Sequence, residues 1–336
     1  MGHEQVENGQ PRHNVLKCIL PKREDDVKFG RMFQDEADKA TRLYHPNVCH
    51  VYEAGEIEGT TFMALEWVYG VALRKLLRRA GADRPLPPRI GAHIIARVAA
   101  ALDYVHHAMG VNGRPLGIIH RDVSPHNSMV SWTGKVKLLD FGIARTSTDQ
   151  RSEEGVVKGK FSYLAPEQAR GKQLDTRCDI FTLGICLYET LTCSPLYHRG
   201  GMMPTLEAIV RENVPSARTV VPHLAPELDA IVQRALQKHP DDRFPKAGHM
   251  RDALDTWLSK TGGPVSDEEV ARYLGLVFGP EDREPLPPQS SQLTGSFQSL
   301  TGSLPQSGSY GPFGTDPRKM EPVETKVGRA TRPADR

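Results

Sequence analysis

The hydrophobic pattern of the chain changes its period near Gly70. Before that point, apolar runs typical of strands occur at 15–20, 51–55 and 61–67. An apolar stripe at spacings of three and four predicts one helix over 29–43. Beyond Gly70 the spacing is helical. Because strands and helices are segregated along the chain, the sequence predicts an α+β fold with a small sheet preceding a larger helical part.

The helical part contains one segment that should lie at its centre. Residues 179–191 are apolar on nearly all sides, which is typical of a buried helix. Residues 94–105 carry an apolar stripe at helical spacing, and weaker stripes follow at 228–236 and 250–258. These segments predict a mainly helical domain that ends near residue 279.

From about residue 280 the composition shifts to Pro, Ser, Gly and Gln, and the tetrapeptide LTGS occurs at 293 and again at 300. Such a segment buries too little apolar surface to offset its ordering entropy. We therefore predict three parts, which are the strand domain 1–68, the helical domain 69–279 and a disordered tail 280–336. The repeat could serve as a docking site or a phosphorylation substrate, but a plain solvated tail is the simpler interpretation.

Charge and composition narrow the functional classes. The net charge of +2, with acids and bases mixed, argues against nucleic acid or an anionic membrane surface as the main partner. Five scattered cysteines within mostly apolar runs favour buried free thiols over disulfides or metal ligands. The chain has no membrane-spanning apolar segment and no signal-peptide pattern at its start, so we expect a cytoplasmic protein.

Three motifs follow one another in the helical part. Residues 120–127 read HRDVSPHN, residues 140–142 read DFG, and residues 165–167 read APE. Each tripeptide is a weak signal alone, but the ordered set resembles the signature of the protein kinases. The resemblance implies a two-lobed fold, with a small β-rich N-lobe and a larger helical C-lobe. Arg121 and Asp122 in this order resemble kinases whose activation segment is ordered by a phosphate bound to that arginine.

The resemblance assigns roles that suit the chemistry of phosphoryl transfer. Charge on the γ-phosphate oxygens of ATP must be neutralised by metal ions, and carboxylate and amide oxygens are good Mg²⁺ ligands. Asp140 would bind Mg²⁺, or alternatively Mn²⁺, and Asn127 would hold a second ion. Asp122 would orient the substrate hydroxyl and accept its proton.

The front of the chain offers an independent check on this resemblance. Lys17 lies on a short apolar run and Glu36 on the inward stripe of the predicted helix, where each would be costly to bury without a partner. Their spacing is similar to that of the lysine and glutamate that fix the α- and β-phosphates in the family.

The adenine site and two structural pairs follow from the same resemblance. Asp179 would accept hydrogen bonds from the HRD backbone, although a helix N-cap is its plain alternative. Arg243 would pair with Glu167. The residues that resemble the adenine site are the gatekeeper Leu65, the hinge residues Glu66 and Val68, and the apolar Val15, Met129 and Leu139.

The activation segment between the DFG and APE motifs contains four hydroxyl side chains as candidate autophosphorylation sites, which are Thr146, Ser147, Thr148 and Ser152.

One departure from the family pattern concerns both the 120–127 loop and the activation segment. The usual lysine two residues after the catalytic aspartate is replaced by Ser124, while Lys160 occupies a position that usually holds a threonine. We hypothesise that the cation has moved from 124 to 160, a combination that resembles kinases of myxobacteria.

A second departure concerns the front of the N-lobe. The family's GxGxxG loop precedes the strand lysine, but only sixteen residues precede Lys17 and their only glycines are Gly2 and Gly9. We therefore expect a shortened N-lobe that lacks the first strands and the glycine loop, unless the true start lies upstream. The sequence favours a bacterial serine/threonine kinase, with a pseudokinase or regulatory scaffold as the alternative. A small-molecule kinase and a tyrosine kinase are weaker alternatives.

Overall fold

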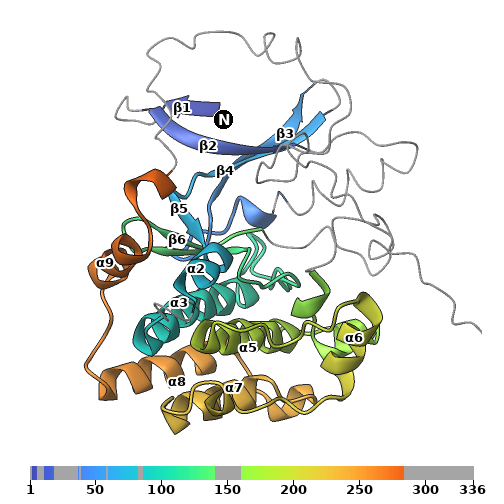
Figure 1. Ribbon diagram of the computed structural model, residues 1–336. Coiled ribbons are helices and arrows are strands. Elements are labelled where there is room, and N and C mark those ends of the chain that lie inside the picture. The colour runs from blue at the N-terminus through green and yellow to red at the C-terminus, as the bar shows by residue number, and fades with distance from the viewer. Residues whose placement is uncertain are drawn as a thin grey trace, which may run out of the picture. The chain divides into compact units, whose positions relative to one another are not determined.

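The computed structural model divides the chain into two compact units, residues 1–287 and 288–336. Every residue discussed below belongs to the first unit, which Figure 1 shows coloured along the chain. The structure describes residues 2–5, 11–18, 37, 39–57, 60–81, 86–140 and 160–283.

The N-lobe is built on an antiparallel sheet with the strand order β1-β2-β4-β3. Its strands are β1 Gly2–Gln5, β2 Pro11–Cys18, β3 Val51–Ile57 and β4 Thr60–Glu66. The register pairs Val15 with Leu65 and Lys17 with Met63. The small sheet predicted from the sequence is therefore confirmed, and the strand that carries Lys17 lies beside the strand that leads into the predicted hinge.

Two features of this sheet differ from the prediction. The expected strand 15–20 begins four residues earlier, because Asn14 and the residues before it find partners on β4 and β1 that an apolar pattern cannot reveal. Strand β1 was not predicted at all, since the front of the chain was expected to lack the strands that precede the lysine. One such strand is present, and the expected absence of a glycine-rich loop stays a prediction.

A small cluster of buried side chains lies between this sheet and the described end of the predicted helix. Ala37 and Ala40 come from the helical segment, and they pack with side chains from the sheet and with Cys49, which lies just before β3. The small cluster consists of Ala37, Ala40, Cys49, Val51, Met63 and Leu65. The predicted apolar face is confirmed at these positions, whereas the helix before residue 37 lies outside the described part of the chain.

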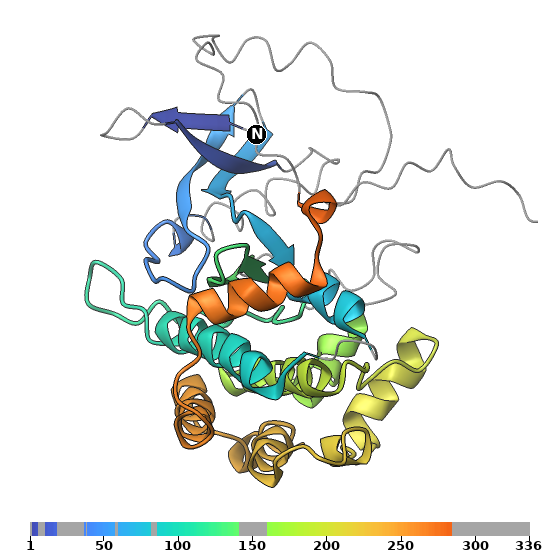
Figure 2. The same ribbon diagram turned by 60° about the vertical axis from the view of Figure 1, so that its left-hand side comes forward.

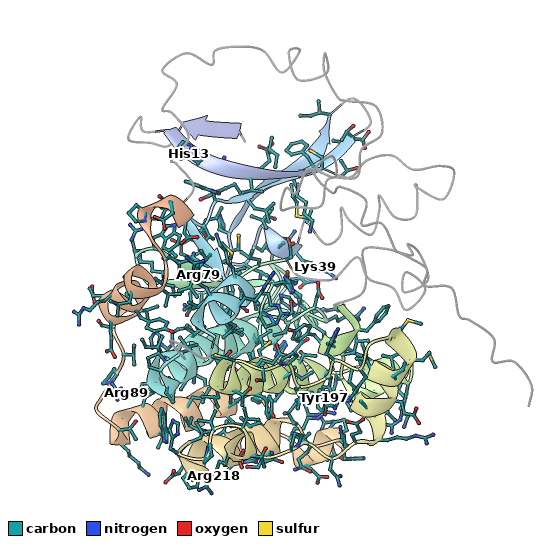
Figure 3. All side chains as sticks on the ribbon, in the orientation of Figure 1. His13, Lys39, Arg79, Arg89, Tyr197 and Arg218 are labelled. Carbon is teal, nitrogen blue, oxygen red and sulfur yellow. The ribbon has the colours of Figure 1, made fainter. Side chains whose placement is uncertain are left out.

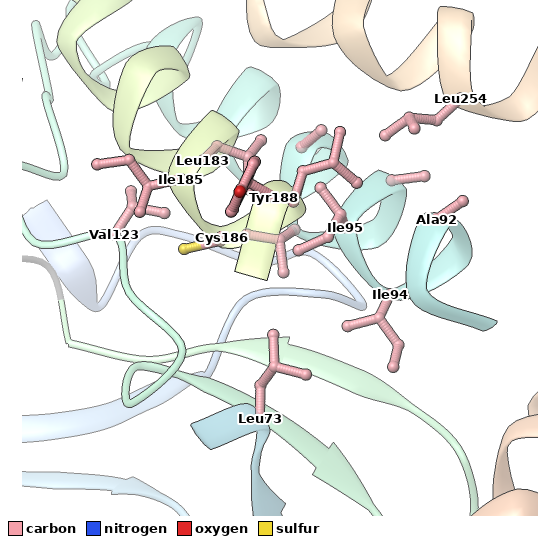
Figure 4. Close-up of a cluster of buried hydrophobic side chains, with 14 of the residues drawn as sticks. Leu73, Ala92, Ile94, Ile95, Val123, Leu183, Ile185, Cys186, Tyr188 and Leu254 are labelled. Atoms are coloured by element: carbon pink, nitrogen blue, oxygen red, sulfur yellow. The ribbon is translucent and has the colours of Figure 1, made fainter. Parts of the chain in front are cut away.

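The C-lobe surrounds one buried helix, as predicted. This helix is α5, Arg177–Thr192, and its side chains from Cys178 to Thr192 are buried. It packs against α3, Pro88–His106, which also contacts α8, Ala247–Lys260. Figure 4 shows Ile94 and Ile95 from α3, Leu183 and Ile185 from α5, and Leu254 from α8 in one hydrophobic core.

The remaining helices are short and cover this core. They are α2 Leu73–Ala80, α4 Pro166–Ala169, α6 Met202–Arg211, α7 Pro226–Ala235 and α9 Asp267–Val277. Short 3₁₀ turns lie between or beyond them, namely η3 Lys160–Tyr163, η4 Ala217–Thr219, η5 Pro240–Asp242 and η6 Pro280–Asp282. None of the helices that the structure describes is long and apolar enough to cross a membrane.

A second sheet inside the C-lobe was missed by the sequence patterns. It has the antiparallel order β5-β6-β7, with β5 Gly70–Ala72, β6 Ser128–Ser131 and β7 Val136–Leu138. Strands of three or four residues are too short to show an alternating pattern. This sheet matters for the site because β6 follows Asn127 directly and β7 ends just before Asp140.

Candidate active site

The loop 120–127 is held by a buried carboxylate at the start of α5. The backbone N–H groups of His120 and Arg121 each donate a hydrogen bond of 2.8 Å to Asp179, as predicted. His106 Nε2 lies 2.8 Å from the same carboxylate. Burial alone would raise the pKa of Asp179, but the hydrogen bond with His106 and the nearby His120 bring that pKa below its ordinary value. Asp179 is therefore a charged anchor for the loop.

Two residues of the candidate site have strained backbones. Arg121 has φ 63° and Asp140 has φ 41°, in the left-handed region that costs an L-residue roughly 1–2 kcal/mol. Such conformations persist only where the surroundings impose them, and they are concentrated at functional sites. At Arg121 the imposing contact is the hydrogen bond from its N–H to Asp179.

Asn127 fixes the carboxylate of Asp122. Its amide nitrogen donates to the Asp122 backbone oxygen at 2.8 Å and to Asp122 Oδ2 at 3.0 Å. Because both hydrogens of the side-chain amide are used in this way, the side-chain oxygen Oδ1 of Asn127 faces away from Asp122. The sequence proposed both residues for the site, and the structure brings them into direct contact.

The third carboxylate is joined to this loop through the residue before it. Leu139 N–H donates to Asn127 O at 2.8 Å, and His120 Nε2 lies 2.9 Å from Leu139 O. Asp140 follows immediately. Side-chain and backbone hydrogen bonds together therefore hold Asp122, Asn127 and Asp140 in one place, although the sequence separates them by up to eighteen residues.

Lys17 reaches this group from the N-lobe. Its Nζ lies 3.0 Å from Asp140 Oδ1, and the two side chains are 47% and 42% exposed. The predicted partner Glu36 lies outside the described residues, so the Lys17–Glu36 pair stays a prediction. An ion pair this exposed contributes little to stability, and a ligand can displace it at little cost.

A pocket opens behind this ion pair. Lys17 and Asp140 line it together with residues of the small cluster, among them Leu65 and Cys49. Leu65 is only 8% exposed, and its role as gatekeeper stays a prediction. Burial raises the pKa of the Cys49 thiol to about 12, so this cysteine is a neutral thiol.

The predicted hinge follows β4. Glu66 N–H donates to His50 O at 2.8 Å, and the Glu66 carbonyl accepts a weak hydrogen bond from Cys49 Sγ at 3.5 Å. The Glu66 side chain accepts from Lys137 Nζ at 2.8 Å, a contact that the sequence analysis missed. A lone lysine between the apolar residues of β7 was the available signal, but it does not name its partner.

The remaining adenine-site candidates lie around this hinge, in positions that do not test their roles. Val68 and Leu139 both pack against the small cluster. Val15 is 40% exposed on β2, and Met129 is half-buried on β6 opposite Ala72. Their contact with adenine stays a prediction.

The activation segment is described only at its C-terminal end. Thr146, Ser147, Thr148 and Ser152 lie outside the described residues, as does the side chain of Lys160, whose backbone begins η3. Ser124 is 5% exposed. The proposed move of the cation from 124 to 160 therefore stays a prediction.

The end of that segment is fixed by a buried ion pair. Arg243 binds Glu167 through two parallel hydrogen bonds of 2.7 and 2.8 Å, as predicted. Its other N–H groups donate to the backbone oxygens of Gln237, Arg177 and Lys238. A buried guanidinium is stable only when its donors are satisfied, and here each has an acceptor.

The arrangement is that of a phosphotransferase, because Asn127 holds the Asp122 carboxylate next to Asp140, and Asp140 and Lys17 line one pocket. The chain belongs to the protein kinase family, because the model of the protein kinase domain matches residues 4–255. Members of this family use ATP and a divalent metal ion.

Relatives with curated names are consistent with this family. A protein named tyrosine-protein kinase MasK, from Myxococcus xanthus, is 35% identical over 92% of this chain and 49% of its own length. The serine/threonine-protein kinase PknB of Mycolicibacterium smegmatis is 39% identical over 71% of this chain and 37% of its own length. The chain thus spans half or less of these relatives.

Solved structures agree with the fold. A crystal structure of the kinase domain of Mycobacterium tuberculosis PknI is similar with a TM-score of 0.56 and 29% sequence identity, over 72% of this chain and 85% of that one. A second crystal structure of the same domain also gives a TM-score of 0.56, over 72% of this chain and 84% of that one. The predicted kinase-like fold, with a small antiparallel N-lobe and a helical C-lobe, is confirmed.

Proposed function

We propose that this chain transfers the γ-phosphate of ATP to serine or threonine hydroxyls of protein substrates. The observation that carries the proposal is the double hydrogen bond from the Asn127 amide to Asp122, in a loop tied to the residue before Asp140. It holds a carboxylate ready to orient a hydroxyl and accept its proton.

The oxygen atoms present fit a magnesium ion. The side-chain oxygen Oδ1 of Asn127 faces away from Asp122. The Asp140 carboxylate is bound by the exposed Lys17, which a cation can replace. Both are hard oxygen donors, and Mg²⁺ characteristically takes one or two protein ligands together with phosphate oxygens and water. Asp140 would hold one ion and Asn127 a second, and these ions would neutralise charge on the transferred phosphoryl group.

Other side chains would position the nucleotide. Lys17, released from Asp140, would bind the α- and β-phosphates, with Glu36 as its partner. The Glu66 carbonyl and the Val68 N–H would bind the adenine edge. We further propose that Lys160 supplies the cation that Ser124 lacks, near the γ-phosphate.

The decisive experiment is transfer of radiolabelled phosphate from ATP to a generic protein substrate, followed by phosphoamino-acid analysis. We expect label on serine or threonine, and loss of that label in Asp140→Ala. The matched control is Asp252→Asn, which removes a carboxylate from an exposed surface ion pair and should leave transfer unchanged. Equal signal in the wild type and Asp140→Ala would reject catalysis and favour the pseudokinase alternative.

A second candidate activity is tyrosine phosphorylation. One observation favours it, namely the name of the Myxococcus xanthus relative, which is 35% identical over most of this chain. The same phosphoamino-acid analysis separates the two activities, because phosphotyrosine as the main product would replace our proposal with this one.

A further inference from the structure

The segment after α8 adds a helix that lies beyond residue 255, where the match to the family ends. This helix is α9, and Figures 1 and 2 show it beside α2. Its residues Val270 and Leu274 are fully buried, and Phe278 just after it is 3% exposed. The added segment, residues 264–283, is therefore part of the C-lobe core.

The added segment is fixed at both ends. At its start, Gly134 has φ +87° and lies so close to Asp267 that a Cβ atom would be 1.8 Å from the Asp267 oxygen. At its end, Arg79 donates to Val277 O at 3.4 Å and pairs with Asp282 at 3.4 Å. Figure 3 shows Arg79 on α2, facing this end of the segment.

An aromatic row leads from the added segment to the N-lobe. Phe278 meets Trp132 edge-on with ring centroids 5.6 Å apart, and Trp132 meets Tyr69 at 6.4 Å. Tyr69 lies 5.2 Å from Trp67, and Trp67 lies 5.2 Å from His13. The backbone N–H of Trp132 also donates to the backbone oxygen of Tyr69 at 3.0 Å. These distances are typical of attractive aromatic pairs.

The row touches the parts of the molecule that the nucleotide would use. Trp67 and Tyr69 are the residues on either side of Val68 in the hinge. His13 lies on β2, and because side chains alternate along a strand, it shares a face with Val15 and Lys17. Phe278 is thus connected to the hinge through the ring of Trp132, and the row continues from the hinge to the lysine strand at His13.

We propose that Phe278 and Trp132 are positioning residues that hold the hinge in the conformation that binds ATP. The proposal rests on the proposed function, in which the hinge binds adenine. A hinge held in place before binding loses less freedom when ATP arrives, so the affinity for ATP is higher. Without the ring of Phe278, the hinge samples other positions and part of the binding free energy is spent on ordering it.

The test replaces Phe278 by leucine, which keeps an apolar side chain but removes the ring. We expect KM for ATP to rise about threefold to tenfold, the range that one aromatic contact supplies, with kcat and KM for the protein substrate within about twofold. Trp132→Phe retains a ring and should stay close to the wild type. The matched control is Leu276→Ala on the same helix, at a side chain that is 63% exposed.

A direct binding measurement separates this proposal from the proposed function. The chain has three tryptophans, and Trp257→Phe leaves only Trp67 and Trp132, both in the aromatic row. In this background, binding of Mg·ADP should change the tryptophan fluorescence emission. Phe278→Leu should raise the Kd for Mg·ADP about threefold to tenfold.

Each outcome decides between the two proposals. A wild type that binds Mg·ADP but transfers no phosphate contradicts the proposed function alone. An unchanged Kd in a folded Phe278→Leu variant contradicts the positioning role. If Phe278→Leu lowers kcat and raises KM for the protein substrate as much as it raises KM for ATP, the role of Phe278 is purely structural. That result would also contradict the positioning role.

Discussion

The ammonium of Lys17 and the carboxylate of Asp140 form an ion pair 3.0 Å apart, and both residues line the pocket beside the small cluster. Both groups have a different proposed partner during catalysis, which is phosphate for the lysine and a metal ion for the aspartate. Binding of Mg·ATP must therefore exchange this ion pair for two new contacts.

Replacing Lys17 by methionine should separate catalysis from stability. Activity should fall about 10²-fold or more because a preorganised charge is lost. Unfolding free energy should change by no more than about 1 kcal/mol because the pair is exposed. Steady-state kinetics and urea unfolding on the same preparation provide the test, and a strongly destabilised variant would contradict this interpretation.

The Arg243–Glu167 pair should behave in the opposite way. Arg243→Ala leaves a buried carboxylate and several backbone oxygens without donors, so the free energy of unfolding should fall by about 3–5 kcal/mol. Arg251→Ala is the control, because Arg251 pairs with Asp252 at 2.7 Å on the surface. Urea unfolding should show a change below about 1 kcal/mol for that control. Similar losses in the two variants would refute the assigned difference.

Glu189 predicts a specific dependence of stability on pH. Burial raises its pKa above the ordinary value of 4.5, even though Tyr163 and the Leu196 N–H donate hydrogen bonds to it. A carboxyl group with a raised folded pKa stabilises the fold below its unfolded pKa and loses that contribution as pH rises through the folded value.

Glu189→Gln should remove this loss, so the variant should gain stability relative to the wild type as pH rises from 4.5 to neutrality. Urea titrations across that range measure the effect. The exposed Glu227→Gln serves as the control. A difference between Glu189→Gln and the wild type that does not vary with pH would argue against this interpretation.

Lys160→Ala tests the proposed relocation of the cation. Removal of one preorganised electrostatic contact should lower kcat about 10²-fold. Lys172→Ala, at an exposed position after α4, should leave kcat unchanged. Near-normal turnover in Lys160→Ala would end the proposal.

Autophosphorylation is testable by mass spectrometry after incubation with ATP. We propose phosphate on Thr146, Ser147, Thr148 or Ser152, where it could bind Arg121. The Asp140→Ala variant provides the background level. An active enzyme with an unmodified segment would contradict the proposal.

The sequence predicted the elements whose pattern is long or whose motif is specific. The period of α5 is evident because the helix is buried on all sides, and the contacts of Asp179 and of Arg243 followed from motif positions. Strands β5, β6 and β7 were missed because so few residues show no period. The contact between Glu66 and Lys137 was missed because it joins residues far apart in sequence, and local patterns carry no information about such pairs.

The separate clustering of buried side chains has a consequence for how the molecule opens. Among the residues that the structure describes, the small cluster of the N-lobe has six buried members, whereas the C-lobe core contains most of the buried residues. A region with few buried contacts opens at lower free energy than the whole protein. Amide hydrogens of β3 and β4 should therefore exchange with solvent well before those of α5. A bound nucleotide should slow hydrogen exchange in β3 and β4 and leave exchange in α5 unchanged.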